Sequence, residues 1–567
     1  MKRQPSVWID HMDKTEWKSE YPECTMYELL AQTAEQVPNK IALVFEGKKI
    51  TFEHLMKMIE KTAKSLNQFN IKKGDVVSII SPNMPQAVYM FYAVNKFGAI
   101  ANMIHPLLSV NEIKESIENT KTKVILILDQ IFPKIAKITW EGIEYPNIIL
   151  TKVIDALPIY AKPIYSLTNK KKTIQEHKQK TIYWNDFLQA SERYQQQPPL
   201  GNHEDVAAIM FSGGTTGTPK GVMLTNDNFN CMYGQLYDIS GFSYSIDMKL
   251  KTLALVPIFH GFGLGVCIHA MLCYGVCSYL IPIFSFEKCI DLIFKKKIQL
   301  IFGVPALFEV LARSTQIETQ DLSFIKMLVS GGDKLPLELQ KRVNDYMQKG
   351  KSTATLREAY GQTECVCACC VSPFFKVKEG SAGIAYPDML LKVVAPNTTE
   401  EVPEGVDGEL CVCGPTVMKG YFNNDNETNR AIQIHSDGRR WLHTGDMVSM
   451  DSEGYIFYKQ RLSRMIISSG YNIYLGQIEE VAQRCPSVEV CCATGIDDKA
   501  VGKRIDLFIE LKHENADKAI CEKELRKLCD ENLPQYSQPQ RIIFIDKIPR
   551  TSMGKIDYKL LSEQGEK

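Results

Sequence analysis

Hydrophobic and polar positions follow two different periods along the first part of the chain. Residues 26–36 (MYELLAQTAEQ) and residues 87–98 repeat their apolar positions at helical spacing. Residues 75–82 and 123–129 contain short apolar runs that are typical of buried strands, and residues 40–52 predict a hairpin with a Glu-Gly turn. Strands that alternate with helices in this way predict a largely parallel sheet with helices on its faces.

Apolar runs return after Asp205, and the pattern changes again in the last third of the chain. The next predicted strands are residues 206–211, 253–259, 298–306 and 325–332. Residues 405–458 read as short strands with glycine turns, which predict a small β-subdomain. The final segment predicts a compact α+β unit with helices and strands at residues 476–484, 521–533, 488–496, 504–511 and 541–546.

These patterns predict an α/β fold with two domains. Residues 1–459 are expected to form a large N-terminal domain, in which mostly parallel sheets are flanked by helices and joined to the small β-subdomain. Residues 460–567 are expected to form a small α+β domain beyond a boundary near Gln460.

Residues 252–286 contain no Asp, Glu, Lys or Arg, which changes the expectation for this stretch. A run of this length would permit a membrane span. Its prolines, glycines, His260 and His269 would interrupt such a helix repeatedly. We therefore expect buried strands and a packed helix around an apolar cavity, with a membrane span as the alternative.

The overall charge argues against a general nucleic-acid binder, with a local basic patch as the alternative. Lys plus Arg and Asp plus Glu both number 66, so the net charge is zero. The N-terminus lacks the apolar run of a secretory signal, so we expect a cytoplasmic protein. Residues 162–180 hold six lysines and one glutamate. This segment predicts a solvated surface, and the alternative is weak peripheral contact with anionic lipid.

The 17 cysteines are expected to be reduced thiols, because disulfide frameworks belong mainly to small secreted domains. The densest cluster is Cys365, Cys367, Cys369 and Cys370. The alternation of its first three members predicts one face of a buried strand. A zinc site is the alternative, but the sequence offers no second ligand pair nearby.

Residues 211–221 (FSGGTTGTPKG) predict a phosphate-binding loop between two strands. The glycines let backbone N–H groups approach an anion, the hydroxyl groups add donors and the lysine adds charge. The spacing differs from that of a Walker loop. A flexible hairpin loop is the alternative. The candidate residues are Ser212, Gly213, Gly214, Thr215, Thr216, Gly217 and Lys220.

Five further motifs follow this loop, and together with it they resemble the adenylate-forming superfamily of acyl-CoA synthetases, luciferases and adenylation domains. The form of the loop, with Gly213, is most similar to bacterial medium- and long-chain fatty acyl-CoA synthetases. The resemblance implies ATP, Mg²⁺ and coenzyme A as cofactors. The motifs are AYGQTE (359–364), GELCVCGPTVMKGY (408–421), WLHTGD (441–446), YKQRLSRMIISSGYNIY (458–474) and PRTSMGKIDY (549–558).

The resemblance implies roles for the residues of AYGQTE. Tyr360 would stack on adenine, since an aromatic face suits any base. Thr363 would donate to the α-phosphate, and Glu364 would hold Mg²⁺, which prefers oxygen ligands. An exposed, solvated loop carboxylate is the alternative for Glu364. Gly361 and Gln362 belong to the same nucleotide-binding segment.

Roles outside this motif follow from the resemblance as well. Asp446 would accept both ribose hydroxyls, with a simple turn residue as the alternative. Arg461 would lie near ribose or phosphate, with a surface linker charge as the alternative. Lys555 would stabilise the charge that develops when the substrate carboxylate attacks the α-phosphate. The remaining predicted nucleotide and coenzyme A residues are Gly332, Asp333 and Gly470.

Residues 258–263 (IFHGFG) bear on the substrate. Adenylation domains for amino acids carry Asp after the Phe of this segment, whereas this chain carries His260. We therefore expect a plain carboxylic acid, with His260 beside the reacting group or, alternatively, as a satisfied core residue. The small residues of the uncharged stretch are expected to leave room for a chain or ring. They are Gly261, Gly263, Gly265, Val266 and Ala270.

The sequence thus predicts a fatty acyl-CoA ligase that forms acyl-AMP and then acyl-CoA. The alternatives are an acyl-AMP ligase that loads a carrier protein, an aryl-CoA ligase and a non-enzymatic nucleotide-binding protein. At the hinge, Ser463 stands where relatives carry a charged residue, which leaves the pH and salt response of domain rotation open.

Overall fold

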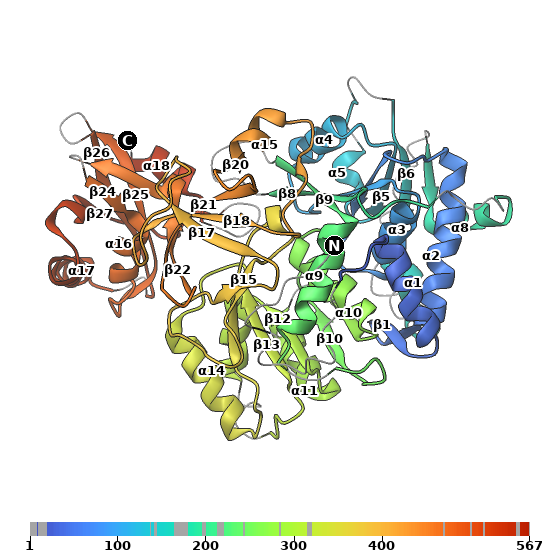
Figure 1. Ribbon diagram of the computed structural model, residues 1–567, viewed down its shortest axis with the longest axis horizontal. Helices are drawn as coiled ribbons and strands as arrows, with labels where there is room; N and C mark the ends of the chain where they lie inside the picture. Colours follow the sequence, from blue (N-terminus) through green and yellow to red (C-terminus); the bar gives the residue numbers. More distant parts are fainter. Residues whose placement is uncertain are drawn as a thin grey trace.

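The computed structural model describes most of the chain (Figure 1). The elements of roughly the first 300 residues form one end of the molecule, and the C-terminal elements, orange to red, form the other end. The described residues are 8, 20–136, 138–140, 144–163, 180–194, 200–212, 220–241, 244–282, 285–314, 320–468, 471–498, 502–513, 516–550 and 556–565.

An eight-stranded sheet has the order β19-β9-β8-β4-β3-β5-β6-β7. The strands from β8 to β7 in this order pair in parallel, whereas β9 pairs antiparallel with β8. The bounds are β3 Val76–Ile80, β4 Ile100–Met103, β5 Val124–Leu128, β6 Asn147–Thr151, β7 Thr181–Tyr183, β8 Val206–Ser212, β9 Lys220–Thr225 and β19 Gly420–Tyr421.

A second sheet has nine strands in the order β16-β15-β14-β13-β12-β10-β11-β1-β2. Its centre is parallel, and the predicted hairpin of β1 and β2 is confirmed at its edge. Glu46 and Gly47 have φ of 45° and 83°, which a tight two-residue hairpin turn requires. The bounds are β1 Ile41–Phe45, β2 Lys48–Thr51, β10 Lys251–Ala254, β11 Cys277–Leu280, β12 Leu300–Gly303, β13 Met327–Gly331, β14 Leu356–Tyr360, β15 Cys370–Val371 and β16 Ile384–Ala385.

Helices pack on and between these sheets. Every residue of α3 (Pro85–Lys96) is buried, as expected for a helix covered on all sides. The other helices of this region are α1 Met26–Gln36, α2 Phe52–Leu66, α4 Val110–Asn119, α5 Phe132–Ile135, α6 Val153–Ala156, α8 Trp184–Gln189, α9 Asn226–Asp238, the π-helix η5 Phe262–Ala270, α10 Met271–Cys273, α11 Phe286–Lys296, α12 Pro305–Arg313 and α14 Leu337–Lys349, with short 3₁₀ turns η2 Asn67–Phe69, η3 Ile159–Ala161, η4 Ala190–Glu192 and η6 Thr363–Cys365.

The predicted small β-subdomain is a five-stranded sheet, and helices and strands follow it as expected. The strands of the sheet are β17 Leu390–Val394, β18 Gly408–Cys413, β20 Ile432–Ile434, β21 Arg440–Met450 and β22 Ile456–Arg461, with α15 Asp425–Ala431 beside them. The elements beyond are η7 Leu462–Arg464, β23 Met465–Ser468, β24 Tyr471–Tyr474, α16 Leu475–Ala482, β25 Val488–Asp498, β26 Gly502–Leu511, α17 Lys518–Asn532, η8 Gln535–Ser537, β27 Arg541–Phe544 and α18 Tyr558–Gly565.

The hydrophobic core is divided between the N-terminal sheets and the C-terminal elements. One large cluster joins both big sheets and much of the β-subdomain. The C-terminal elements bury separate clusters that share no residue with it, one of them around Ile478, Leu507 and Leu525. The fold is therefore α/β with a large N-terminal part and a smaller C-terminal α+β part.

The cysteine cluster is buried, but the predicted strand is wrong. Cys365 ends the 3₁₀ turn η6, and Val366 follows with φ of 65°, which breaks any extended run. Only Cys370 of the four lies in a strand, the two-residue β15. The four thiols act as core residues around a tight turn, and no group that could hold a metal is found there among the described residues.

The uncharged stretch forms buried strands and a packed helix, as predicted. Within the described residues, no helix is long and apolar enough to cross a membrane. At its centre His269 is fully buried, and burial lowers its pKa to about 3. The Tyr92 hydroxyl lies 3.1 Å from His269 Nδ1, and Nε2 lies 3.0 Å from Asn230 Oδ1. The lysine-rich segment lies mostly outside the described residues, since 164–179 are not among them.

Candidate active site

Tyr360, Asp446 and Arg461 meet where the second large sheet touches the β-subdomain. Asp446 on β21 stands opposite Arg461 on β22 in the antiparallel register. The Tyr360 hydroxyl donates to Asp446 Oδ2 at 2.5 Å, and Arg461 Nε lies 3.0 Å from Asp446 Oδ1. A simple turn residue would be exposed at the surface, whereas only 1% of Asp446 is exposed. Burial raises the pKa of Asp446, and the adjacent Arg461 opposes that shift.

Glu364 is buried beside β19, at the edge of the eight-stranded sheet. It lies in η6, directly after Thr363, and is 7% exposed. The Tyr421 hydroxyl donates to Glu364 Oε1 at 2.9 Å. The alternative of an exposed, solvated carboxylate is therefore wrong. A buried carboxylate next to the Thr363 hydroxyl offers the oxygen donors that Mg²⁺ prefers.

Gly361 and Gln362 shape the turn that carries these two residues. A Cβ at Gly361 would lie 2.3 Å from Ala368 Cα, so no other residue fits this close approach. The Gln362 carbonyl accepts the N–H of Cys365 and closes the 3₁₀ turn. The sequence AYGQTE thus fixes Thr363 and Glu364 at the carboxyl end of β14.

The glycine-rich loop connects two antiparallel strands, as predicted. Ser212 at the end of β8 pairs in register with Lys220 at the start of β9. Lys220 Nζ bonds the carboxylate of Glu427 on α15 and lies 5.2 Å from the ring centre of Tyr421. Lys220 is therefore held by a carboxylate at the mouth of the loop. The predicted residues Gly213, Gly214, Thr215, Thr216 and Gly217 lie outside the described residues.

Gly332 and Asp333 follow β13, on the same edge of the sheet as Tyr360. Gly332 has φ of 84°, and it lines a cavity together with Gly331 and Ala359. Asp333 Oδ1 accepts the N–H of Lys334 at 2.8 Å. Lys334 Nζ in turn lies 3.5 Å from Glu480 on α16, which connects this edge with the C-terminal part.

The two remaining predicted residues of the C-terminal part, Gly470 and Lys555, lie outside the described residues. Lys555 is followed by Ile556, which forms an isolated antiparallel bridge with Arg550. Tyr558, at the start of α18, lies under the guanidinium of Arg464 at 4.0 Å. These contacts tie the described ends of the PRTSMGKIDY motif to the segment after β22.

His260 lies in the turn before the π-helix, close to η6. A Cβ at the next residue, Gly261, would lie 1.6 Å from the Val366 carbonyl oxygen, so the two turns are in direct contact. The His260 ring lies edge-on to His105 with centroids 6.2 Å apart. The sequence patterns did not single out His105, which lies two residues after β4, a strand that they did not predict either. Burial lowers the pKa of His105.

Glu358 is a second titratable residue that the sequence did not single out. Burial raises the pKa of its carboxyl to about 7, and the nearby Lys334 opposes this shift while Asp333 adds to it. The Leu335 N–H donates to Glu358 Oε1 at 3.2 Å. Its position two residues before Tyr360, on the strand that leads to the site, could have marked it.

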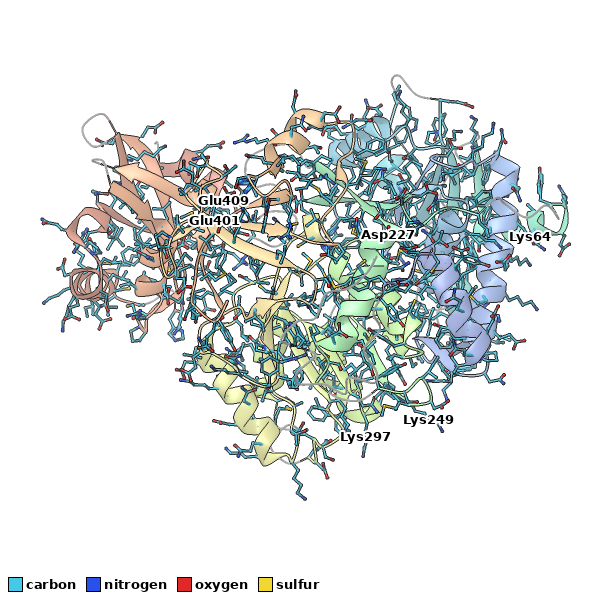
Figure 2. All side chains as sticks on the ribbon, viewed as in Figure 1. Lys64, Asp227, Lys249, Lys297, Glu401 and Glu409 are labelled. Carbon is cyan, nitrogen blue, oxygen red and sulfur yellow. The ribbon has the colours of Figure 1, made fainter. Side chains whose placement is uncertain are left out.

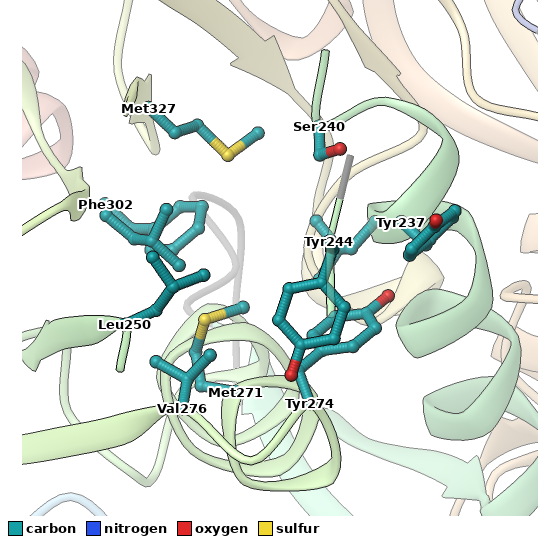
Figure 3. Close-up of a pocket in the computed structure, with 11 residues that line it drawn as sticks. Tyr237, Ser240, Tyr244, Leu250, Met271, Tyr274, Val276, Phe302 and Met327 are labelled. Carbon is teal, nitrogen blue, oxygen red and sulfur yellow. The ribbon is translucent and has the colours of Figure 1, made fainter. Parts of the chain in front are cut away.

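Two small adjoining cavities, of about 30 and 20 Å³, lie behind this edge. The near cavity begins at Gly331, Gly332 and Ala359. The far cavity continues between α9, the end of the π-helix and the sheet (Figure 3). The walls shared by both are Leu236, Phe302 and Met327.

The expectation that the small residues of the uncharged stretch leave room for a ligand is wrong for its glycines. A Cβ at Gly263 would lie 2.0 Å from the Pro257 carbonyl oxygen, and a Cβ at Gly265 would lie 2.9 Å from a Val366 methyl group. With Gly261, these glycines let backbones pack closely and leave no room for a ligand. Among the five predicted residues, Val266 lines a described cavity.

Sequence comparisons agree with this arrangement. The AMP-binding enzyme family matches residues 30–422, more than half of the chain, and the AMP-binding enzyme C-terminal domain matches residues 477–555. A long-chain-fatty-acid–CoA ligase of Bacillus subtilis is 32% identical, with 97% of this chain and 98% of that protein covered. A probable 4-coumarate–CoA ligase 2 of Dictyostelium discoideum is 29% identical over 96% of this chain and 95% of its own length.

A solved structure shares the fold. The ATP-bound MatB of Rhodopseudomonas palustris superposes with a TM-score of 0.79 at 22% identity, covering 95% of this chain and 98% of that one. The six ordered motifs, the meeting of Tyr360, Asp446 and Arg461, and the family match over most of the sequence lead to one conclusion: the chain belongs to the AMP-binding enzyme family.

Proposed function

We propose that the protein is an AMP-forming acid–thiol ligase that activates a medium- or long-chain fatty acid. ATP and Mg²⁺ serve the first step, which forms acyl-AMP and pyrophosphate, and coenzyme A accepts the acyl group in the second step. The observation that supports a fatty acid as the substrate is the pair of adjoining apolar cavities behind Gly331 and Gly332.

The cavity walls favour an alkyl chain. The far cavity is lined mainly by aliphatic, sulfur-containing and aromatic side chains, and its hydroxyl groups belong to Ser240 and three tyrosines. No charged residue lines either cavity. An acid with a second charge would lose its hydration there without a partner. A chain that enters past Ala359 must widen both cavities as it fills them, and it gains roughly 0.8 kcal/mol for each buried methylene.

The polar residues at the cavity mouth supply the nucleotide site. Asp446 would accept the ribose hydroxyls after Tyr360 gives up its hydrogen bond and turns its ring to the adenine. Glu364 would hold Mg²⁺ against the phosphates, because it is a buried carboxylate at the correct edge of the sheet. Thr363 would donate to the α-phosphate, and His260 would border the reacting carboxylate.

The C-terminal part would serve the two steps in turn. In this proposal residues 1–459 form the fixed domain and residues 460–567 the mobile one, with the pivot just after β22, so Gln460 keeps its place in that strand. Lys555 acts in adenylation while Gly470 faces coenzyme A. Gln460 Oε1 accepts the Gly476 N–H at 3.0 Å, a contact that must adapt when the hinge turns. The separate hydrophobic clusters of the C-terminal elements support movement as a unit.

The test is acid-dependent exchange between ATP and pyrophosphate across fatty acids of increasing length, with coumarate and benzoate alongside. We expect exchange to rise with chain length until the cavities are filled. Exchange with aromatic acids alone would replace the proposal with an aryl-CoA ligase. No exchange with any acid would contradict adenylation itself.

Two further measurements separate the steps. Thioester formation from free coenzyme A excludes a carrier protein as the required acceptor. Lys555→Ala should lower adenylation by about 100-fold or more, the loss typical of a group that stabilises developing charge. The same variant should still form thioester from supplied acyl-AMP, and unchanged adenylation would contradict the role of Lys555.

A further inference from the structure

A histidine and cysteine cluster lies in the β-subdomain, away from the cavities. Cys411 on β18 stands opposite His443 on β21 in the antiparallel register. His435 follows β20 and closes the turn that leads into β21, since its N–H donates to the Arg439 carbonyl. Figure 2 labels Glu409, two residues before Cys411, in the same sheet.

The side chains of this cluster converge. His435 Nε2 lies 3.0 Å from His443 Nε2, and Cys411 Sγ lies 3.6 Å from His443 Nδ1. One ligand atom from each of the three residues lies within 4.8 Å of the others. Among the described residues this is the one group of its kind, and all three side chains are almost completely buried.

Glu409 fixes the tautomer of His443. Its Oε2 lies 2.9 Å from His443 Nδ1, so an ionised carboxylate there accepts the Nδ1 proton. His443 Nε2 then carries a lone pair that faces His435. A histidine that donates one ring nitrogen to a carboxylate and presents the other to an ion is the usual arrangement of metal-bound histidines.

We propose that Cys411, His435 and His443 bind a divalent transition-metal ion through Sγ and two Nε2 atoms, with Glu409 holding His443 in place. One thiolate and two imidazoles favour Zn²⁺ over Mg²⁺, which selects oxygen ligands. Tetrahedral Zn²⁺, with bonds of about 2.0 Å to nitrogen and 2.3 Å to sulfur, places its ligand atoms roughly 3.3–3.6 Å apart. To reach this spacing, the Cys411 side chain has to turn from the Nδ1 side of the His443 ring towards Nε2, and water can take the fourth position.

The competing interpretation is a hydrogen-bonded core without an ion. In that case His435 Nε2–H donates to His443 Nε2, which leaves His435 Nδ1 as an acceptor. This atom is buried without a hydrogen-bond partner among the described residues. If an ion were bound at Nε2, the same atom would carry the proton and would still have no partner, so the metal titration is what separates the two arrangements.

Binding requires the Cys411 thiol to lose its proton. Each ion that binds therefore releases one proton, and affinity increases with pH. This proton release distinguishes the site from an ion held loosely at the surface.

The experiment uses the full chain, reduced and stripped with a chelator, in excess Mg²⁺. Titration with Co²⁺ should give a thiolate-to-cobalt absorption band that saturates at one equivalent and disappears when Zn²⁺ is added. Cys411→Ser should abolish the band, and His435→Gln should abolish or greatly weaken it. Cys413→Ser is the matched control, because this cysteine lies two residues along the same strand but outside the cluster.

Glu409→Gln should weaken binding by about 10- to 100-fold, as loss of a carboxylate behind a metal-bound histidine does. A wild-type protein without the band, or a band that persists in both Cys411→Ser and His435→Gln, would overturn the proposal. Circular dichroism of the metal-free variants checks their folding. If Cys411→Ser is unfolded, His435→Gln decides the question, since its side chain leaves a turn.

Discussion

The adjoining cavities lead to a specific prediction for Val276→Phe. Val276 is 1% exposed and lines the far cavity but not the near one. A phenyl ring at this position would occupy space that the distal end of a long acyl chain fills. A short acid reaches only the near cavity, so its activation should hardly change.

The magnitude follows from the area that the chain buries. If the ring displaces about four methylenes at roughly 0.8 kcal/mol each, transition-state binding of a long acid loses about 3 kcal/mol. This corresponds to a fall in kcat/KM of more than about 100-fold. Overpacking itself should lower the free energy of unfolding by about 1–3 kcal/mol.

The assay compares kcat/KM for octanoate and palmitate by pyrophosphate exchange in wild type and variant. Val124→Phe is a matched control, because Val124 is equally buried but lies on β5 in the other large sheet. It should lower stability without changing the ratio of the two acids. An equal loss for both acids in Val276→Phe, or no loss for either, would refute the proposed path of the chain.

Three other predictions concern the polar residues. Asp446→Asn removes the charge opposite Arg461 and weakens the contact with the ribose. The KM for ATP should therefore rise by about 10-fold or more in steady-state kinetics. An unchanged KM would contradict the proposed role of Asp446 in ribose binding. Glu427→Gln releases Lys220 from a half-buried ion pair worth about 1 kcal/mol, so the KM for ATP should fall by up to about 5-fold. A rise in KM would mean that Glu427 helps to bind the nucleotide. The pKa of His269 is about 3 in the folded state, below its value of about 6.5 in the unfolded state. Its contribution to the free energy of unfolding is therefore fully present above about pH 6.5. That contribution falls by about 1.4 kcal/mol for each pH unit as the pH drops towards 3. His269→Gln should therefore show a shallower loss of stability in urea denaturation between pH 6.5 and 4, and equal slopes would contradict this account.

Much of the architecture follows from local sequence patterns. Most of the strands predicted for the two large sheets, and the predicted C-terminal elements, are present within a few residues. Strands β4, β6, β7, β11 and β14 were not predicted. The cysteine-rich segment was misassigned because alternation alone cannot reveal a turn. Its geometry depends on Val366, which adopts a positive φ against the backbone of Gly261 more than 100 positions earlier in the sequence.

The site shows the same division. Motif order identified Tyr360, Asp446 and Arg461, which the structure brings together. His105 and Glu358 were missed because their burial results from tertiary packing, and single-sequence patterns do not report which titratable groups lose water. The pairing of Lys220 with Glu427 joins residues from distant segments, so no local spacing predicts it.

The π-helix of residues 262–270 has a consequence for how chain-length preference could change. It accommodates more residues in each turn than an α-helix does, and its C-terminal end directs Met271 and Tyr274 into the far cavity. Deleting one residue from it would permit regular α-helical bonding. Every later side chain up to the next strand would then rotate by roughly 100°. A single deletion would therefore change which side chains line the far cavity. Insertions and deletions in this helix would then alter the preferred acyl chain length without changing either sheet.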